Sequence, residues 1–523
     1  MSARHGTLLR GLTSTTKSPQ FQGRFGRLFR SLPSAKYGKD DNDSRNNLMN
    51  LGALMTSDFD SPKDAPDAEE SGIPALYTYF SQFIDHDITF DPMSSLMKHS
   101  DPAALTDFRT PTLDLDNVYG RGPDDQPYMY DGRQFLLGDP IKGGVDQNAR
   151  DLPRDNRDNK DGRRALIGDP RNDENTIVSQ LQGLFLRFHN RTVRDHPEID
   201  PQTDFDKIQQ LVRFHYQYVV LNDFLPRIVH SSVLKDLKND DGYFDRNKLK
   251  FFHWKNEPFM PVEFSVAAYR LGHSMIRPGY RLNDNVLLPI FPIPPAIDPP
   301  TGIPEGLTGF RPMIPAWGID WGRFIDLDIR SYGTDPGNNP PDAPTKKRLQ
   351  FAYRIDTSVV TPLSVLPAVV AANPSSLPQR NLIRSFELCL PNGQDVAQAM
   401  HIKPLDDKDI VIGKAVDQPE QGDVKGTIAT IPALSVFKGN CPLWTYILAE
   451  AAKNQETVKI PVTENKQITT PKLGPVGGRI VAEVFLGMLF GDPDSMLVID
   501  PKWQPPKGKD YRLKDLVNYA LGN

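Results

Sequence analysis

Residues 73–90, which read IPALYTYFSQFIDHDITF, decide the fold class of this chain. Apolar side chains recur there at helical spacing, at Leu76, Tyr79, Phe80, Phe83 and Ile84. This spacing predicts a mostly buried helix that ends near the polar run at residues 85–87. We therefore expect a helical core that includes this segment.

Helical periodicity returns at later points, over residues 175–194, 205–225, 264–277, 375–385, 443–452 and 474–490. Proline has no N–H to give to a helix, and it is dense over residues 287–315. Residues 334–345 are similar, and the 48 prolines of the whole chain indicate many ordered loops. The predicted fold is mainly α, a single large helical domain with little β structure.

The composition limits the classes of function. A chain of 523 residues can enclose a sizeable core and a buried cofactor pocket. Its 61 basic and 66 acidic residues give a net charge of −5. The chain as a whole therefore has no positive charge that would attract nucleic acid or an anionic membrane. The two cysteines, Cys389 and Cys441, exclude a cysteine-based zinc or iron–sulfur framework. With no run of 18 apolar residues, the chain is expected to lack a membrane span. A monomer that acts on small substrates is expected.

The first 39 residues contain eight Lys or Arg residues and no acid. Such a segment is either a basic arm lying on the body or an organelle transit peptide. Phe21, Phe25 and Phe29 favour a docked arm, so we expect an arm at residues 1–45 and a catalytic domain at residues 46–523. The segment lacks the apolar region of a standard secretion signal, so the expected location is the cytoplasm, or outside it by a non-standard export route.

Two segments place polar groups beside the predicted core helices. Gln82, Asp85 and His86 occupy positions i, i+3 and i+4, so they project from one helix face. Residues 168–175 lead into the next helix, with Arg171 and Glu174 at positions i and i+3. Each segment also has a purely structural interpretation, the first as a polar helix end and the second as helix-start chemistry.

A second imidazole lies on an otherwise apolar stretch, where His273 follows Gly272. Glycine inside a helix costs about 1 kcal/mol relative to alanine, so a flat ring close to the backbone is one explanation. A hydrogen-bonded core histidine is the other. Asn381 and Arg384 form a further i, i+3 polar pair on a predicted amphipathic helix.

Residues 110–116, which read TPTLDLD, offer hydroxyl and carboxylate oxygens at alternate positions. Oxygen ligands in this pattern suit Ca²⁺, which takes six to eight oxygens in loose geometry. The spacing does not match an EF-hand. A calcium site and a plain aspartate-rich turn are both compatible with it.

Together and in this order, these five segments resemble the animal-type haem peroxidase family, also called the peroxidase–cyclooxygenase superfamily, and especially its bacterial members. The resemblance runs from about residue 23 to residue 494 and includes LGPVGGRIVAE at residues 473–483. It implies a mainly α fold with haem b between central helices.

The resemblance also implies roles for the two imidazoles and their neighbours. His86 is expected to be the distal base, with Gln82 beside it and Arg171 as the distal cation. His273 is expected to bind the haem iron, with Asn381 as the partner of its second ring nitrogen.

Further residues match positions that hold the haem and a metal ion in the family. Asp85 and Glu174 match the carboxylates that form ester bonds to the haem in mammalian members. Arg270 and Arg384 match arginines near the haem propionates. The implied Ca²⁺ ligands are Asp87, Thr110, Thr112, Asp114 and Asp116.

The implied activity is reduction of hydrogen peroxide with oxidation of halides, thiocyanate or phenols. Asn175 stands where some mammalian members have the methionine of a third haem link, so neither that link nor ready chloride oxidation is expected. Fatty-acid dioxygenases of the superfamily are the nearest alternative, but they carry a tyrosine where this chain has Arg270. A non-catalytic binding or adhesion protein on the same fold is the alternative from another class.

Overall fold

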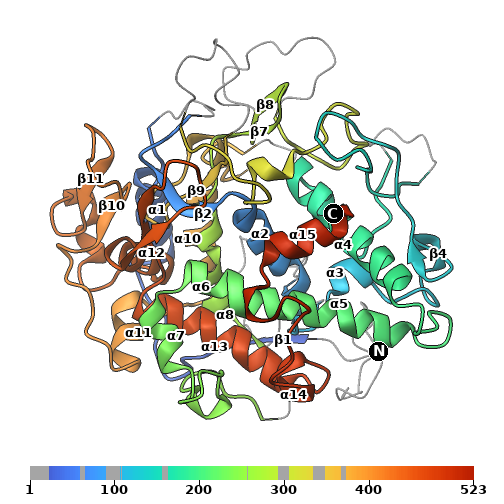
Figure 1. The fold of residues 1–523 in the computed structure, drawn as a ribbon. Coiled ribbons are helices and arrows are strands. Elements are labelled where there is room, and N and C mark those ends of the chain that lie inside the picture. Colours follow the sequence, from blue (N-terminus) through green and yellow to red (C-terminus); the bar gives the residue numbers. More distant parts are fainter. Residues whose placement is uncertain are drawn as a thin grey trace.

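Helices form most of the regular structure, and the strands are short (Figure 1). The computed structural model describes residues 23–58, 65–89, 106–107, 109–155, 163–255, 257–291, 306–333, 348–366 and 373–522. Its α-helices are α1 (Asp41–Leu54), α2 (Leu76–Ile88), α3 (Asp116–Tyr119), α4 (Thr176–Asp195), α5 (Phe205–Val219), α6 (Leu225–Ile228), α7 (Ser231–Asp236), α8 (Val262–Ser265), α10 (Leu377–Glu387), α11 (Gly393–Ala399), α12 (Leu443–Lys453), α13 (Pro475–Gly491), α14 (Met496–Ile499) and α15 (Leu513–Leu521). The predicted mainly α fold with little β structure is confirmed.

The strands pair in small sheets. They are β1 (Gly23–Gly26), β2 (Glu70–Pro74), β3 (Thr106–Asp107), β4 (Tyr130–Asp131), β5 (Gln134–Phe135), β6 (Met260–Pro261), β7 (Gly279–Asn283), β8 (Val286–Pro289), β9 (Phe351–Tyr353), β10 (Val411–Gly413), β11 (Val424–Thr427), β12 (Gln455–Lys459) and β13 (Gln467–Pro471). Strand β1 lies between β3 and β6, antiparallel to the first and parallel to the second. The antiparallel pair β2–β9 ends directly before α2 and so fixes where that helix begins.

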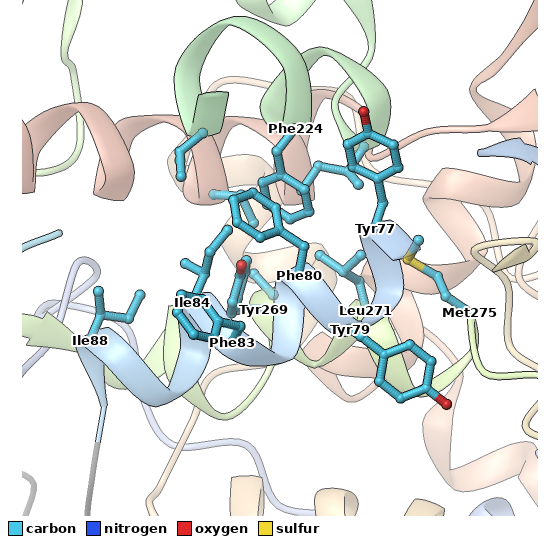
Figure 2. Close-up of a cluster of buried hydrophobic side chains, with 14 of the residues drawn as sticks. Tyr77, Tyr79, Phe80, Phe83, Ile84, Ile88, Phe224, Tyr269, Leu271 and Met275 are labelled. Carbon is cyan, nitrogen blue, oxygen red and sulfur yellow. The ribbon is translucent and has the colours of Figure 1, made fainter. Parts of the chain in front are cut away.

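Helix α2 lies in the core, and 11 of its 13 residues are buried. Its Phe83 stacks on Phe185 of α4 with ring centroids 4.4 Å apart. On another side, Phe80 meets Phe224 edge to face at 5.7 Å. Figure 2 shows Tyr269 and Leu271, from the segment before His273, close to the same helix. The two imidazole-bearing segments therefore share one core.

Most of the predicted helices are observed with small shifts at their ends. The prediction over residues 175–194 corresponds to α4, and those over 375–385, 443–452 and 474–490 correspond to α10, α12 and α13. The long helix predicted over residues 205–225 is α5 followed by a π-helical turn, Val220–Phe224, and then α6. Of the proline-rich stretches, residues 292–305 and 334–345 lie outside the described residues, whereas residues 287–291 and 306–315 are described.

The continuous helix predicted over residues 264–277 is wrong. Helix α8 ends at Ser265, and Ala267 has φ −132° and ψ −75°, which breaks the α-helical path. A 3₁₀-helix, η6 (Ala268–His273), follows. With three residues per turn, residues at i and i+3 of a 3₁₀-helix lie one above the other. Arg270 and His273 therefore share one edge of η6.

The π-helical turn carries a buried carboxylate that joins three parts of the fold. The hydroxyl of Tyr77, at the start of α2, donates to Oδ2 of Asp223 at 2.5 Å. The backbone N–H of Leu513, at the start of α15, donates to the same oxygen at 2.8 Å, and Nε of Arg227 donates to Oδ1 at 2.9 Å. Asp223 thus ties the C-terminal helix to the core helix.

The division into an arm at residues 1–45 and a domain at residues 46–523 stays a prediction. Phe25 and Phe29 are buried against the body, Phe21 lies outside the described residues, and α1 runs through the expected boundary. Over the part of the chain that the structure describes, no helix combines the length and apolar character needed to cross a membrane.

Candidate active site

His86 lies in the last turn of α2, buried, with a fixed hydrogen-bond partner. Its Nδ1 lies 2.7 Å from Oδ1 of Asn172. The amide nitrogen of Asn172 donates to Oε1 of Gln182 at 2.7 Å, which fixes the orientation of the Asn172 amide. Because an amide oxygen only accepts, Nδ1 of His86 carries the proton and Nε2 keeps its lone pair. Burial, and then the charge of Arg171, lower the pKa of His86 to about 4, so this ring is neutral at neutral pH.

Gln82 and Glu174 lie beside the open nitrogen of His86. The side-chain amide of Gln82 donates to Oε1 of Glu174, and that oxygen lies 3.9 Å from Nε2 of His86. Surrounding protein raises the pKa of Glu174 to about 7, yet 35% of its side chain remains exposed. The carboxyl group of Glu174 is therefore crowded by protein and still accessible to a ligand. The charge of Asp85 adds to the raised pKa of Glu174, which places both predicted ester carboxylates in one region.

Arg171 holds the C-terminal end of α2. Its guanidinium donates to the carbonyl oxygens of Thr89 at 2.6 Å and His86 at 3.1 Å. It also pairs with the buried carboxylate of Asp169 at 2.8 Å, which Arg109 contacts as well. Burial opposes the charge of Asp169, but the two guanidinium groups outweigh it and hold the pKa of that carboxyl far below its usual range. A cation is thereby fixed close behind His86.

His273 ends η6, and its second ring nitrogen has an amide partner on α10. Nδ1 of His273 lies 2.7 Å from Nδ2 of Asn381. As placed, that amide nitrogen would donate to Nδ1. A half-turn of the amide puts its oxygen at the same position, so that Nδ1 donates and Nε2 is left to bind a metal. Burial, and then the charge of Arg270, lower the pKa of His273 to about 3, so the ring is a neutral ligand.

The segment around His273 touches α2 directly but leaves space at Gly272. The hydroxyl of Tyr269 donates to the carbonyl of Ser81 at 3.3 Å. A Cβ atom added at Gly272 would come no closer than 3.9 Å to Oγ of Ser81. No described protein atom therefore explains the glycine by close contact, and the open space suits a flat ring, as the sequence suggested.

Basic side chains gather on the His273 side. Arg270 donates from Nε to the carbonyl of Ser265 at 3.1 Å. Burial, and then the nearby charge of Arg270, lower the pKa of Arg380, so these two guanidinium groups lie close together. Arg384 lies one turn further along α10. Like charges this close to each other suit a ligand with carboxylate groups.

Asp87 follows His86 and is fully buried. Both of its carboxylate oxygens lie without a hydrogen-bond partner among the described residues. Burial, and then the charges of Asp114 and Asp116, raise the pKa of Asp87 well above its usual range. Three adjoining acids with an unsatisfied buried carboxylate fit a bound cation.

The loop at residues 110–116 carries two of these acids, Asp114 and Asp116. The hydroxyls of Thr110 and Thr112 each donate to Oδ2 of Asp114 at 2.8 Å. Within the described ranges, no three His, Cys, Asp or Glu side chains are arranged to hold a metal ion by themselves. A Ca²⁺ ion here would need hydroxyl or main-chain oxygens as further ligands.

The sequence did not single out the residues that position these groups. Asn172 and Gln182 set the tautomer of His86, and Asp169 holds Arg171. Asn172 and Asp169 looked like helix-start residues, and only the fold brings them against α2. Gln182 lies on α4, two turns from the helix start.

Comparison with known proteins confirms the resemblance predicted from the sequence. Residues 97–294 match the family model described as animal haem peroxidase. A dual oxidase from Drosophila melanogaster is 31% identical over 123 residues, which are 23% of this chain and 7% of that protein. The chain thus aligns with only a small part of this relative. The match to bacterial members in particular stays a prediction.

Solved structures share the fold at low sequence identity. Peroxidase A from Dictyostelium discoideum has a TM-score of 0.58 and 14% identity, over 96% of this chain and 93% of that one. A fatty acid alpha-dioxygenase from Oryza sativa has a TM-score of 0.51 and 15% identity, over 91% of this chain and 78% of that one. Both peroxidase and dioxygenase structures therefore resemble this fold.

Proposed function

We propose that this chain, which resembles the animal haem peroxidases, binds haem b and reduces hydrogen peroxide while oxidising a small reductant. The observation that carries the proposal is a pair of neutral imidazoles on touching segments, His86 buried and His273 half-buried. His86 presents an unprotonated Nε2 on one segment, and His273 has an amide partner for its Nδ1 on the other. This is the division between proton acceptor and iron ligand that peroxide chemistry needs.

The residues fit a haem in chemical terms. Gly272 leaves open space beside His273, and Arg270, with Arg384 on α10, supplies positive charge for the propionates. Asp85 and Glu174 would form ester links to the ring. When bound, haem would supply the iron that takes up peroxide and the oxidising equivalents passed to the reductant.

The protein groups would act on the protons and charges of the peroxide. Nε2 of His86 would accept a proton from one peroxide oxygen and return it to the departing oxygen. The guanidinium charge of Arg171, fixed close to His86, would favour the developing negative charge. Gln82, bonded to Glu174, would orient the bound peroxide.

The proposed reductants are iodide, bromide, thiocyanate and phenols. With its amide turned so that the oxygen faces Nδ1, Asn381 would be a neutral acceptor, and it would leave the ring of His273 less anionic than a carboxylate partner would. A less anionic ligand would keep the reduction potential of the haem iron high, and a high potential would favour oxidation of poor electron donors. Calcium bound by Asp87, Thr110, Thr112, Asp114 and Asp116 would fix the end of α2 and so the position of His86.

The test is reconstitution of the purified chain with haem, followed by absorption spectra and peroxide-dependent oxidation of iodide and a phenol. His273→Leu should lose the iron–imidazole spectrum. His86→Gln should keep that spectrum and lose turnover by at least about 100-fold. The exposed His253 provides a matched control, and His253→Gln should leave both measurements unchanged. An unchanged spectrum in His273→Leu would refute the assigned ligand, and a chain that takes up no haem would favour a binding protein.

A fatty-acid dioxygenase is the second candidate, because a solved dioxygenase shares the fold. Arg270 occupies the position of the tyrosine that this chemistry uses. Tyr269 is one residue away, and its ring stacks on Phe264 at 4.7 Å while its hydroxyl bonds to Ser81. Oxygen uptake with linoleate in the absence of peroxide would favour the dioxygenase over the peroxidase.

A further inference from the structure

A hollow of about 450 Å³ lies between α4, α5 and the C-terminal segment that leads into α15. Figure 1 shows α15 beside α4 near the C-terminus. None of the residues assigned to haem or calcium lines it. Its size is within the range of small-molecule sites.

Aromatic rings form much of the wall, namely Phe188, His215, Trp503, Tyr511 and Tyr519. His215 meets Trp503 edge to face at 5.0 Å and Tyr511 at 5.4 Å. Phe188 meets Tyr519 at 5.0 Å. Ring faces and edges held in this way favour a flat aromatic guest over a flexible aliphatic one.

The wall also carries polar atoms, among them Nε2 of His215 and the hydroxyl of Tyr511. Nδ1 of His215 donates to the carbonyl of Leu211 at 2.8 Å, so Nε2 of the neutral ring is an acceptor. Neither Nε2 nor the hydroxyl of Tyr511 has a hydrogen-bond partner among the described residues, and neither is sealed from solvent. Lys507 and Asp515 at the hollow pair with each other at 2.6 Å. A second lining residue, His196, pairs with Glu198 at 2.8 Å. Nε2 of His215 and the hydroxyl of Tyr511 are therefore neutral polar atoms beside charged groups that already have partners.

We propose that this hollow binds a neutral aromatic compound of one or two rings that donates an O–H or N–H group to Nε2 of His215. The rings of the wall would enclose the guest, and the hydroxyl of Tyr511 would serve as a second polar contact. The site is separate from the proposed haem pocket, so its occupation neither requires nor tests peroxidase activity.

The test uses 2-naphthol as the probe and calorimetric titration of the full chain, as purified and without peroxide. Decahydro-2-naphthol has the same carbon skeleton and hydroxyl but no aromatic rings, and it should bind at least about tenfold more weakly. Equal affinity for the two probes would overturn the aromatic class of ligand. Absence of naphthol binding would overturn the site.

Two substitutions locate the binding. Asn518 lines the hollow from a partly exposed position on α15, so Asn518→Trp should fill the hollow and abolish binding. The matched control is Asn50→Trp at an exposed position of α1, which should leave binding unchanged. His215→Phe keeps a ring but removes the acceptor, and it should weaken binding about tenfold. Naphthol affinity that is unchanged in Asn518→Trp and His215→Phe, with both variants folded by circular dichroism, would place the ligand elsewhere and refute the proposal.

Discussion

The side-chain amide of Asn381 lies 2.7 Å from Nδ1 of His273. This contact joins α10 to the end of η6 and gives the proposed iron ligand a neutral partner. A neutral partner and an anionic one have opposite effects on electron density at the ring, so the contact can be tested by changing its charge.

Asn381→Asp should lower the reduction potential of the haem-loaded chain, because a carboxylate would make the imidazole a stronger donor. We expect a fall on the order of 60 mV, a tenfold change in the one-electron equilibrium. Spectroelectrochemical titration measures it. Asn50→Asp on α1 is the matched control, and a potential that falls equally in both variants would contradict the role of Asn381.

Asn172→Leu should lower kcat/KM for peroxide about tenfold or more, because Nδ1 of His86 would lose the acceptor that keeps Nε2 unprotonated. In the unmodified chain, kcat/KM should fall as the pH drops through about 4, where His86 gains a proton and stops accepting one. Asn172→Asp should move this fall to higher pH, because a carboxylate stabilises the protonated ring. A pH profile identical in all three proteins would show that Asn172 does not act through His86.

Removal of calcium should destabilise the chain. With the cation gone, burial and the charges of Asp114 and Asp116 would outweigh the Leu115 N–H and the charge of Arg109, which favour the ionised carboxylate of Asp87. We expect a chelator to lower Tm and added Ca²⁺ to restore it, with about one calcium per chain by metal analysis. Asp87→Asn should abolish the calcium-dependent shift, whereas Asp240→Asn at an exposed position should retain it. A Tm that does not respond to chelator would remove the calcium site.

Covalent attachment of haem should depend on two carboxyl groups. After peroxide treatment, haem should largely resist acidic organic extraction from the unmodified chain. Asp85→Asn and Glu174→Gln should each release more haem, and the double variant should release nearly all of it. Full release from the unmodified chain would refute the ester links while leaving the peroxidase proposal intact.

Glu450 should make stability depend on pH. Its carboxyl accepts the N–H groups of Val476 and Gly477 at the start of α13, and burial raises its pKa to about 7 from the usual 4.5. The folded state therefore binds more protons than the unfolded state between these values, so this contribution to stability is present below pH 4.5 and lost as the pH rises through 7.

Relative to Glu450→Gln, the unmodified chain should therefore lose up to about 3 kcal/mol of unfolding free energy between pH 4 and 8. Denaturant unfolding across this range measures the difference. Glu420→Gln, at an exposed position, should show no such trend. A constant difference between Glu450→Gln and the unmodified chain would contradict the raised pKa.

The sequence was most informative where apolar spacing is long and regular. Helices α2 and α4 begin and end within three residues of their predicted limits, because each buries a continuous apolar face. The helix predicted around His273 was wrong, because the apolar residues have helical spacing while the backbone at Ala267 is not helical. Periodicity cannot reveal such a break, because it reports which residues are apolar and not the path of the backbone.

The candidate site divides in the same way. The sequence singled out His86 and His273, and the family resemblance implied their roles, which stay predictions. The structure places an amide beside each ring. The positioning by Asn172, Gln182 and Asp169 depends on contacts between residues far apart in the chain, such as the 2.7 Å contact of Asn172 with His86. Asn172 and Asp169 could be explained as residues that begin a helix, so the sequence provided no reason to expect their contacts with His86 and Arg171.

Because Asp223 accepts hydrogen bonds from both Tyr77 and Leu513, helix α15 is connected to the buried core helix α2. In a chain that ended before Leu513, the buried carboxylate of Asp223 would lose one hydrogen-bond donor. The damage would begin at the N-terminal end of α2, the helix whose other end carries His86. Removal of α15 should therefore destabilise the region around Tyr77, which is more than 400 residues earlier in the sequence.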